Sequence, residues 1–152
     1  YRSPRFSKID LKILKRLDFK YDSSVNPTFI PGRYNYFGHT RKIKKENDII
    51  VIPMSVSPIF RLPLFWFAFK NLGLFYSKFI TRMCLLDQDF VHLVFHPWEF
   101  EELSKYNIPF IYKLNTGDSL MKKLDNYIIW CKRNNMRFDT VQNYLMNKGY
   151  IK

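Results

Sequence analysis

Ile49-Ile50-Val51-Ile52 is an unbroken run of β-branched residues, and it is the segment that decides the fold class. β-Branched side chains favour strands because they pack well on a pleated surface. A half-exposed strand would alternate apolar and polar residues, and this run does not alternate. The run therefore predicts a strand that is buried on both faces, as the strands of parallel sheets are.

Other strands are predicted on either side of this run. The apolar segment Phe90–Phe95 is the second buried-strand pattern, and it stops abruptly at His96-Pro97. Shorter strands are predicted at Phe19–Ser23 and Arg137–Asp139. The segment Val25–Thr40 is rich in Pro, Gly and Asn, which favours a loop.

Apolar residues at helical spacing predict the first helices. We expect the first helix to open at Ser7, with Asp10 three residues later in a box-like capping arrangement. Its apolar face comprises Ile9, Ile13, Leu14 and Leu17. A long aromatic helix is predicted from about Leu64 to Leu85.

Two more helices are predicted in the C-terminal third. One begins near Gly117, and its apolar side carries Leu120, Leu124, Tyr127, Ile128 and Cys131. Thr140 is expected to cap a final helix that runs through Leu145. Cys84 and Cys131 both lie in apolar helical stretches, so we expect both to be buried thiols.

The alternation of strands and helices predicts an α/β fold with parallel strands over residues 1–152, as a single domain. The predicted strands number about four, whereas a closed α/β barrel needs about eight. We therefore expect a partial (β/α) barrel whose N-terminal strands are missing, with an exposed sheet edge. The first residue, Tyr1, is not Met, which agrees with a fragment of a longer protein.

Composition excludes a disordered chain, because hydrophobic residues make up 47% and aromatic residues 18% of the sequence. The apolar run Ile59–Phe75 is interrupted by charged, Pro and Gly residues and falls short of the ~20 residues that a spanning helix needs. A buried helix is expected there. The alternative is a helix lying against a membrane or a lipid-linked glycan.

The net charge of +12 is compatible with nucleic acid, anionic lipid or an acidic glycan as a partner. The basic residues are scattered apart from one short cluster at 41–45, and no zinc-finger or RNA-binding signature accompanies them. We therefore interpret them as solvated surface and expect no nucleic-acid partner. A basic nucleic-acid-binding domain is the third hypothesis, supported by charge alone.

Arg2, Asp22 and His96 are polar residues at predicted strand ends, which converge on one face of a parallel α/β barrel. His96 has the side chain suited to proton transfer near neutrality. Arg2 can hold a carboxylate by two hydrogen bonds, and Asp22 can accept one from the His96 ring. No role is assigned to His39 or His92.

The sequence segments around these residues resemble motifs of the NodB-type polysaccharide deacetylases. Residues 1–7 (YRSPRFS) resemble the Arg-x-Pro element of the third motif, and residues 21–27 (YDSSVNP) one form of the fourth. Residues 93–100 (LVFHPWEF) resemble the fifth motif, in which a hydrophobic strand ends in the catalytic His. Their order is that of the family, and Phe138-Asp139-Thr140 closes the resemblance over essentially the whole chain.

The resemblance implies hydrolysis of an N-acetyl, or sometimes O-acetyl, group on a polysaccharide or oligosaccharide. In the family a divalent metal such as zinc polarises the acetyl carbonyl and activates water. Carried over, His96 is the general acid, Arg2 positions the base carboxylate and Asp22 orients His96. The walls of the substrate groove would include Pro4, Phe6 and Trp98.

The first two family motifs, an Asp-Asp pair and a His pair, do not occur in these 152 residues. The resemblance therefore places the metal ligands upstream, and we expect no catalytic metal bound by this chain alone. The alternative hypothesis is a non-catalytic carbohydrate-binding relic of the deacetylase fold. Many members of the deacetylase family act on envelope or exported polysaccharide, so the resemblance suggests a bacterial protein. The sequence leaves both a cytoplasmic and an envelope location open.

Overall fold

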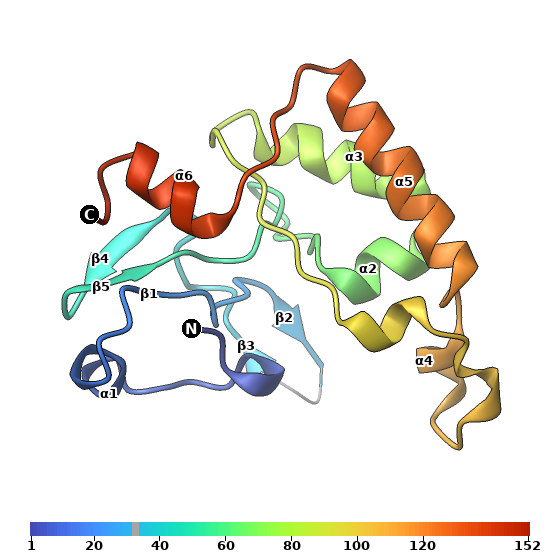
Figure 1. Ribbon diagram of the computed structural model, residues 1–152, viewed down its shortest axis with the longest axis horizontal. Helices are drawn as coiled ribbons and strands as arrows, with labels where there is room; N and C mark the ends of the chain where they lie inside the picture. The colour runs from blue at the N-terminus through green and yellow to red at the C-terminus, as the bar shows by residue number, and fades with distance from the viewer. Residues whose placement is uncertain (32–33) are drawn as a thin grey trace. The chain divides into compact units, whose positions relative to one another are not determined.

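The computed structural model describes residues 1–31 and 34–152, which form a mixed α/β structure. The chain divides into two compact units. Unit 1 comprises Tyr1–Pro63 together with Phe138–Lys152, and unit 2 comprises Leu64–Arg137 (Figure 1). Each unit carries part of the predicted site, so the two are described in turn.

Unit 1 is built on a three-stranded sheet in the order β1-β5-β4 (Figure 1). Its central strand β5 (Ile49–Val51) is buried along its whole length and runs parallel to β1 (Tyr21–Asp22). On its other side β5 pairs antiparallel with β4 (Lys44–Glu46), whose side chains are exposed. The strands predicted at Phe19–Ser23 and Ile49–Ile52 are therefore confirmed, and each is shorter than predicted.

The predicted loop Val25–Thr40 contains a hairpin of two short strands, β2 (Phe29–Ile30) and β3 (Tyr34–Asn35). The part of that prediction at residues 32–33 lies outside the described residues. The loop prediction was wrong for these strands, because the Pro and Gly signal outweighed the strand preference of Phe29 and Ile30.

The helices of unit 1 are the 3₁₀ turn η1 (Pro4–Phe6), α1 (Leu11–Arg16) and α6 (Val141–Asn147). The predicted start of the first helix at Ser7 is wrong. Asp10 is the capping residue, because its carboxylate accepts a hydrogen bond from the Lys12 N–H at 2.9 Å. The cap of α6 is confirmed, since the Thr140 hydroxyl oxygen accepts from the Asn143 N–H at 3.1 Å.

Unit 2 is helical, and its longest predicted helix is broken in two. The predicted helix from Leu64 to Leu85 consists of α2 (Trp66–Asn71) and α3 (Gly73–Cys84). The break falls at Gly73, whose φ of 82° is accessible to glycine and costly for other residues. The helix that was predicted to begin near Gly117 is α5 (Asp118–Arg133), and it begins directly after that glycine.

Segment Phe90–Phe95 is not a strand, so that prediction was wrong. Its apolar side chains pack on helices instead of entering a sheet. Leu93 and Phe95 lie against the core cluster of Phe69, Leu120, Tyr127 and Cys131, and Val91 and Leu93 against that of Leu64, Ile80 and Cys84. The predicted strand Arg137–Asp139 is likewise absent.

The two clusters make the core of unit 2 and explain its pairing of α3 with α5, which lie side by side in Figure 1. A buried hydrogen bond of 2.6 Å joins the Thr81 hydroxyl to the Tyr127 hydroxyl across these helices. Cys84 and Cys131 are both buried and form no disulfide, and their burial was predicted. Within the described residues, no helix is both long and apolar enough to cross a membrane.

Three short elements complete unit 2. These are the 3₁₀ turns η2 (Pro97–Phe100) and η3 (Leu103–Lys105) and the one-turn helix α4 (Phe110–Lys113). The turn η2 follows directly on His96, which is its N-terminal capping position. Proline suits the first position of such a turn because it has no N–H to leave unpaired. The sequence His-Pro thus fixes the point at which the extended segment ends.

Candidate functional site

His96 is held by a carboxylate one turn further along the chain. The Nδ1 atom of His96 lies 2.6 Å from Oε1 of Glu99, and the side chain of His96 remains 43% exposed. Residues three apart eclipse each other in a 3₁₀ turn, so η2 places Glu99 directly over the imidazole. With Nδ1 engaged by Glu99, Nε2 is the ring nitrogen that is left to face a ligand.

Glu99 is completely buried, at 0% exposure, which is unusual for a carboxylate. Its second oxygen, Oε2, has no hydrogen-bond partner among the residues that the structure describes. Burial raises the pKa of Glu99, while the hydrogen bond with His96 and the charge of Lys70 act in the opposite direction. The carboxyl group of Glu99 therefore keeps its proton to a higher pH than a surface glutamate does, as groups at functional sites often do.

Lys70 supplies the positive charge near Glu99, and it too is buried, at 1% exposure. Its ammonium donates a hydrogen bond of 2.9 Å to the Tyr112 carbonyl and lies 5.2 Å from the centroid of the Trp66 ring. Burial lowers the pKa of Lys70, and the charge of Glu99 opposes that effect. Lys70 and Glu99 thus bear a desolvation cost that their attraction offsets only in part.

Aromatic rings enclose the imidazole of His96. The Trp98 ring stacks on it with centroids 5.3 Å apart, and the Trp66 ring meets it edge-on at 5.4 Å. Trp66 is buried, whereas Trp98 is 40% exposed and offers a ring to solvent. Trp98 therefore lies beside His96 as a groove wall would, although its role toward a substrate stays a prediction.

In unit 1 the other predicted polar residues are Arg2 and Asp22, which are electrostatic neighbours. Burial lowers the pKa of Arg2, and the charge of Asp22 opposes this. The carboxylate of Asp22 is 2% exposed and accepts from the Ser24 hydroxyl at 2.5 Å and the Ser24 N–H at 3.3 Å. Arg2 Nε donates to the Ser23 hydroxyl at 3.0 Å. Asp22 thus closes a turn directly after β1.

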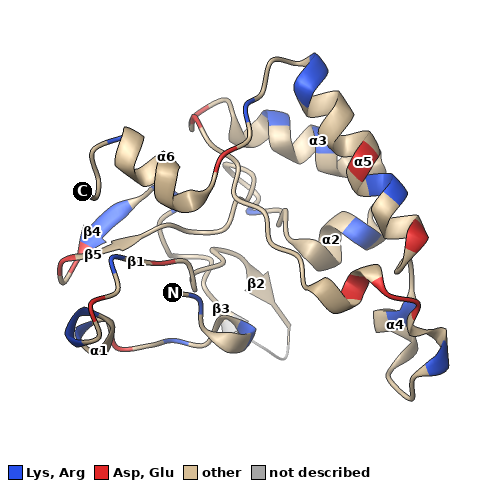
Figure 2. Ribbon diagram, in the orientation of Figure 1, with Lys and Arg blue, Asp and Glu red and all other residues tan. Residues whose placement is uncertain are grey.

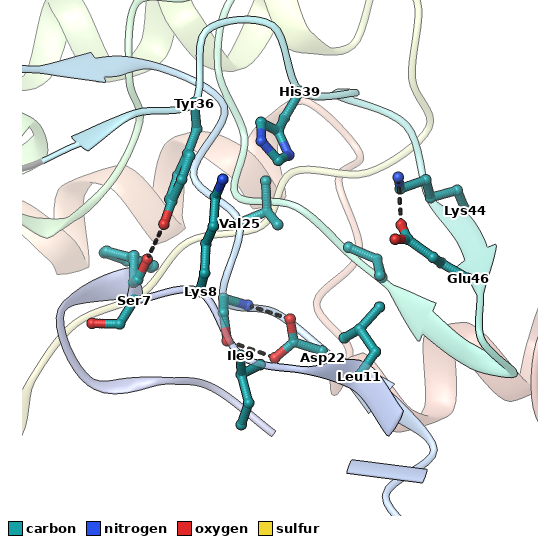
Figure 3. A pocket seen from close by; sticks show the side chains of 13 residues that line it. Ser7, Lys8, Ile9, Leu11, Asp22, Val25, Tyr36, His39, Lys44 and Glu46 are labelled. Atoms are coloured by element: carbon teal, nitrogen blue, oxygen red, sulfur yellow. Dashed lines mark hydrogen bonds and ion pairs between the residues drawn. The ribbon is translucent and has the colours of Figure 1, made fainter. Parts of the chain in front are cut away.

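The predicted groove residues of unit 1 lie on η1. Pro4 is exposed, and Phe6 is buried against a cavity of about 260 Å³ that Asp22 also lines (Figure 3). The Tyr36 hydroxyl donates a hydrogen bond of 3.0 Å to the Phe6 carbonyl and ties η1 to the cavity wall.

The structure therefore gathers the predicted residues into two sets, Arg2, Asp22, Pro4 and Phe6 in unit 1 and His96 and Trp98 in unit 2. The predicted bond between Asp22 and His96 stays a prediction, and the partner seen at Nδ1 is Glu99. Sequence reasoning missed Glu99 and Lys70. The spacing His96-Pro97-Trp98-Glu99 was the available signal, because Pro97 starts a turn that aligns residues three apart.

Two of the four basic residues in the 41–45 cluster are paired with acidic residues. Figure 2 shows Lys and Arg on elements of both units, including β4 and α5. In the 41–45 cluster, Lys44 pairs with Glu46 at 2.6 Å and Lys45 with Asp48 at 3.2 Å, while Arg41 Nε donates to the Val56 carbonyl at 3.0 Å. This pairing supports the interpretation of the cluster as ordinary surface charge.

The described residues contain no group of three or more His, Cys, Asp or Glu side chains that could hold a metal ion. The divalent metal that the resemblance implies does not fit any set of ligands in this part of the chain. The chemistry below is therefore derived from the chain's own side chains.

Comparison with protein-family models, with curated proteins and with solved structures gives no match. Functional inference therefore rests on the motifs and on the geometry around His96 and Asp22.

Proposed function

We infer that this chain carries the proton-donating part of a carbohydrate deacetylase site, which removes an acetyl group, in the first place an N-acetyl group, from a glycan. The observation that supports this most is the pair of His96 with the fully buried Glu99, beside the exposed ring of Trp98. A proton donor can protonate the amine that leaves when a sugar amide is hydrolysed, and a flat apolar ring can stack on the sugar.

The proton transfer follows from the hydrogen bond at Nδ1. When the carbon–nitrogen bond of an acetamide breaks, the leaving amine must gain a proton, and an imidazolium can donate it near neutral pH. Glu99 binds Nδ1–H and so leaves Nε2–H directed away from it, toward the substrate. The negative charge of Glu99 stabilises the imidazolium until the proton leaves, and Trp98 presents a face on which a pyranose ring can stack.

The remaining roles come from the resemblance. It implies that Arg2 positions a base carboxylate, that Asp22 orients His96, and that Pro4 and Phe6 line the groove. It also implies a divalent metal, a partial (β/α) barrel and metal ligands in motifs that these residues do not contain. No step here is routed through that metal.

Acetate release tests the proposal most simply. The gene product that contains this chain is incubated with N-acetylated chito-oligosaccharides, and acetate is measured for the wild type and for His96→Ala. A general acid contributes about 100-fold or more, so His96→Ala is expected to lower kcat by that factor. Leu86→Ala, at a 75% exposed position after the end of α3, is the control that should keep the full rate. Full turnover by His96→Ala would remove His96 from the mechanism.

The second candidate is a glycan-binding protein without turnover, and the 40% exposure of Trp98 favours it as much as it favours an enzyme. Both candidates predict that Trp98→Ala weakens binding of the oligosaccharide. Only the enzyme releases acetate. Binding that depends on Trp98, with no acetate released by the complete gene product, would establish the second candidate instead.

A further inference from the structure

The cavity in unit 1 has a cationic wall that takes no part in the deacetylation chemistry. Lys8 and His39 form this wall together with Tyr36, and Figure 3 shows the Lys8 amine reaching toward both rings. The Lys8 ammonium lies 5.8 Å from the centroid of the Tyr36 ring, and the His39 ring meets Tyr36 edge-on at 5.1 Å. Tyr36 is itself fixed by its bond to the Phe6 carbonyl.

The cavity is lined by two cations, Lys8 and Lys44, and by two carboxylates, Asp22 and Glu46. Lys44 is paired with Glu46 at 2.6 Å, and the carboxylate of Asp22 accepts hydrogen bonds from Ser24 and lies in the field of the Arg2 guanidinium. Among the described side chains, no carboxylate pairs with Lys8, and no hydrogen bond engages the ring nitrogens of His39. A singly charged anion would supply the missing partner, with the imidazole as a second donor.

The size and walls of the cavity limit what carries that anion. Its volume of about 260 Å³ is below the roughly 300 Å³ at which pockets for drug-sized ligands begin, so it suits a single ring. The lining also includes the apolar side chains of Val25, Leu11 and Phe6. A ring with one carboxylate matches both the charge and the lining.

We propose that this cavity binds the carboxylate-bearing sugar of an acidic glycan, a uronic acid residue, with Lys8 and His39 on the carboxylate and Tyr36 and Phe6 on the ring. That the ring is a sugar rests on the proposed function. The preference for a carboxylate rests on the charge of Lys8 and does not depend on that function.

The test compares two ligands that differ only at the sixth carbon. Methyl β-glucuronide carries a carboxylate there and methyl β-glucoside a hydroxymethyl group, and the binding of each is measured by calorimetry and by NMR shifts of the His39 ring. A lost charge-assisted hydrogen bond corresponds to about tenfold or more in affinity, so the glucuronide is expected to bind at least that much more tightly. Equal affinities, or no shift of the His39 ring, would overturn the proposal.

Two variants and one competitor locate the site. Lys8→Met keeps the length of the side chain and is expected to abolish the preference for the glucuronide, whereas Lys12→Met, at an exposed position of α1, should keep it. If Lys8→Met still prefers the glucuronide to the glucoside, the proposal is overturned, whatever Lys12→Met does. Inorganic phosphate that binds as tightly as the glucuronide would also overturn it, because the cavity would then be a general anion site.

The outcomes separate this proposal from the proposed function. Selective glucuronide binding without acetate release from any glycan would leave the cavity and remove the deacetylase. Acetate release that depends on His96, without preference for the glucuronide, would do the reverse.

Discussion

Asp22 in unit 1 and Glu99 in unit 2 are both buried carboxylates, yet they are satisfied in different ways. Both oxygens of Asp22 accept hydrogen bonds from Ser24, which lies two residues along the same turn. Glu99 has one partner, His96, and its other oxygen has none among the described residues. Asp22 is 2% exposed and Glu99 is 0% exposed, so burial alone does not separate them.

The two carboxylates differ in whether they can exchange a proton with their hydrogen-bond partners. Asp22 is bound to an N–H and a hydroxyl that do not titrate near neutral pH, so it serves to hold a turn. Glu99 is bound to the Nδ1 atom of His96, and imidazole is the side chain suited to proton transfer. A buried carboxylate with a titratable partner and an unsatisfied oxygen is an unfavourable arrangement for stability, and such arrangements gather at functional sites.

The largest change in stability is expected at Lys70, whose charge acts on Glu99. Lys70→Met removes the hydrogen bond to the Tyr112 carbonyl and the positive charge that acts on the buried Glu99, which should cost about 2–3 kcal/mol of unfolding free energy. Urea unfolding measures this change. Lys122→Met, at an exposed position of α5, is the matched control and should change stability by less than about 0.5 kcal/mol. A loss equal to that of the control would show that Lys70 is not buried beside Glu99.

A smaller effect is expected at Asp22. Asp22→Ala leaves the hydroxyl and N–H of Ser24 unpaired in a buried turn, at a cost of about 1–2 kcal/mol. A double-mutant cycle with Ser24→Ala isolates the interaction and should give a coupling of about 1 kcal/mol. An absence of coupling would contradict the view of Asp22 as a residue that holds this turn.

The smallest effect separates the two carboxylates by activity. Glu99→Gln keeps an oxygen that can accept from Nδ1–H but removes the charge that stabilises the imidazolium. We expect kcat for acetate release to fall about tenfold, with little change in KM and an altered pH profile. A fall in KM or stability with an unaltered pH profile would show that Glu99 only packs against His96.

Two similar sequence runs show how far the fold could be predicted. Ile49–Ile52 is apolar throughout and Phe90–Phe95 is apolar except for His92, yet only the first run contains a strand. The first has β1 and β4 as neighbours, whereas the second buries Leu93 and Phe95 against helices. Apolar character predicts burial, but pairing depends on which distant segments are available, and a single run does not reveal that.

The candidate site was predictable to the same extent. His96 and Trp98 were identified by motif, and the structure brings them together with Trp66 and Lys70, which lie about 30 residues earlier in a stretch that patterns as an aromatic helix. A lysine in such a helix is normally expected at the surface. Its burial depends on the Tyr112 carbonyl and the Trp rings, which are tertiary contacts.

The carboxyl group of Glu99 offers the most direct measurement of the central claim that His96 and Glu99 form a proton-handling pair. With ¹³C-labelled glutamate, NMR follows the titration of Glu99 in the wild type and in His96→Gln. Because burial raises the pKa of Glu99, we predict a midpoint above the ordinary value of 4.5. The His96→Gln variant should show a still higher one, because the hydrogen bond from His96 lowers it.

The same shift sets the pH dependence of stability. A carboxyl whose pKa is higher in the folded state contributes stability that is present below its unfolded pKa and is lost as the pH rises through its folded pKa. The unfolding free energy of the wild type should therefore fall across that window, and Glu99→Gln should fall less. A Glu99 midpoint at or below 4.5 that does not respond to His96→Gln would contradict the account.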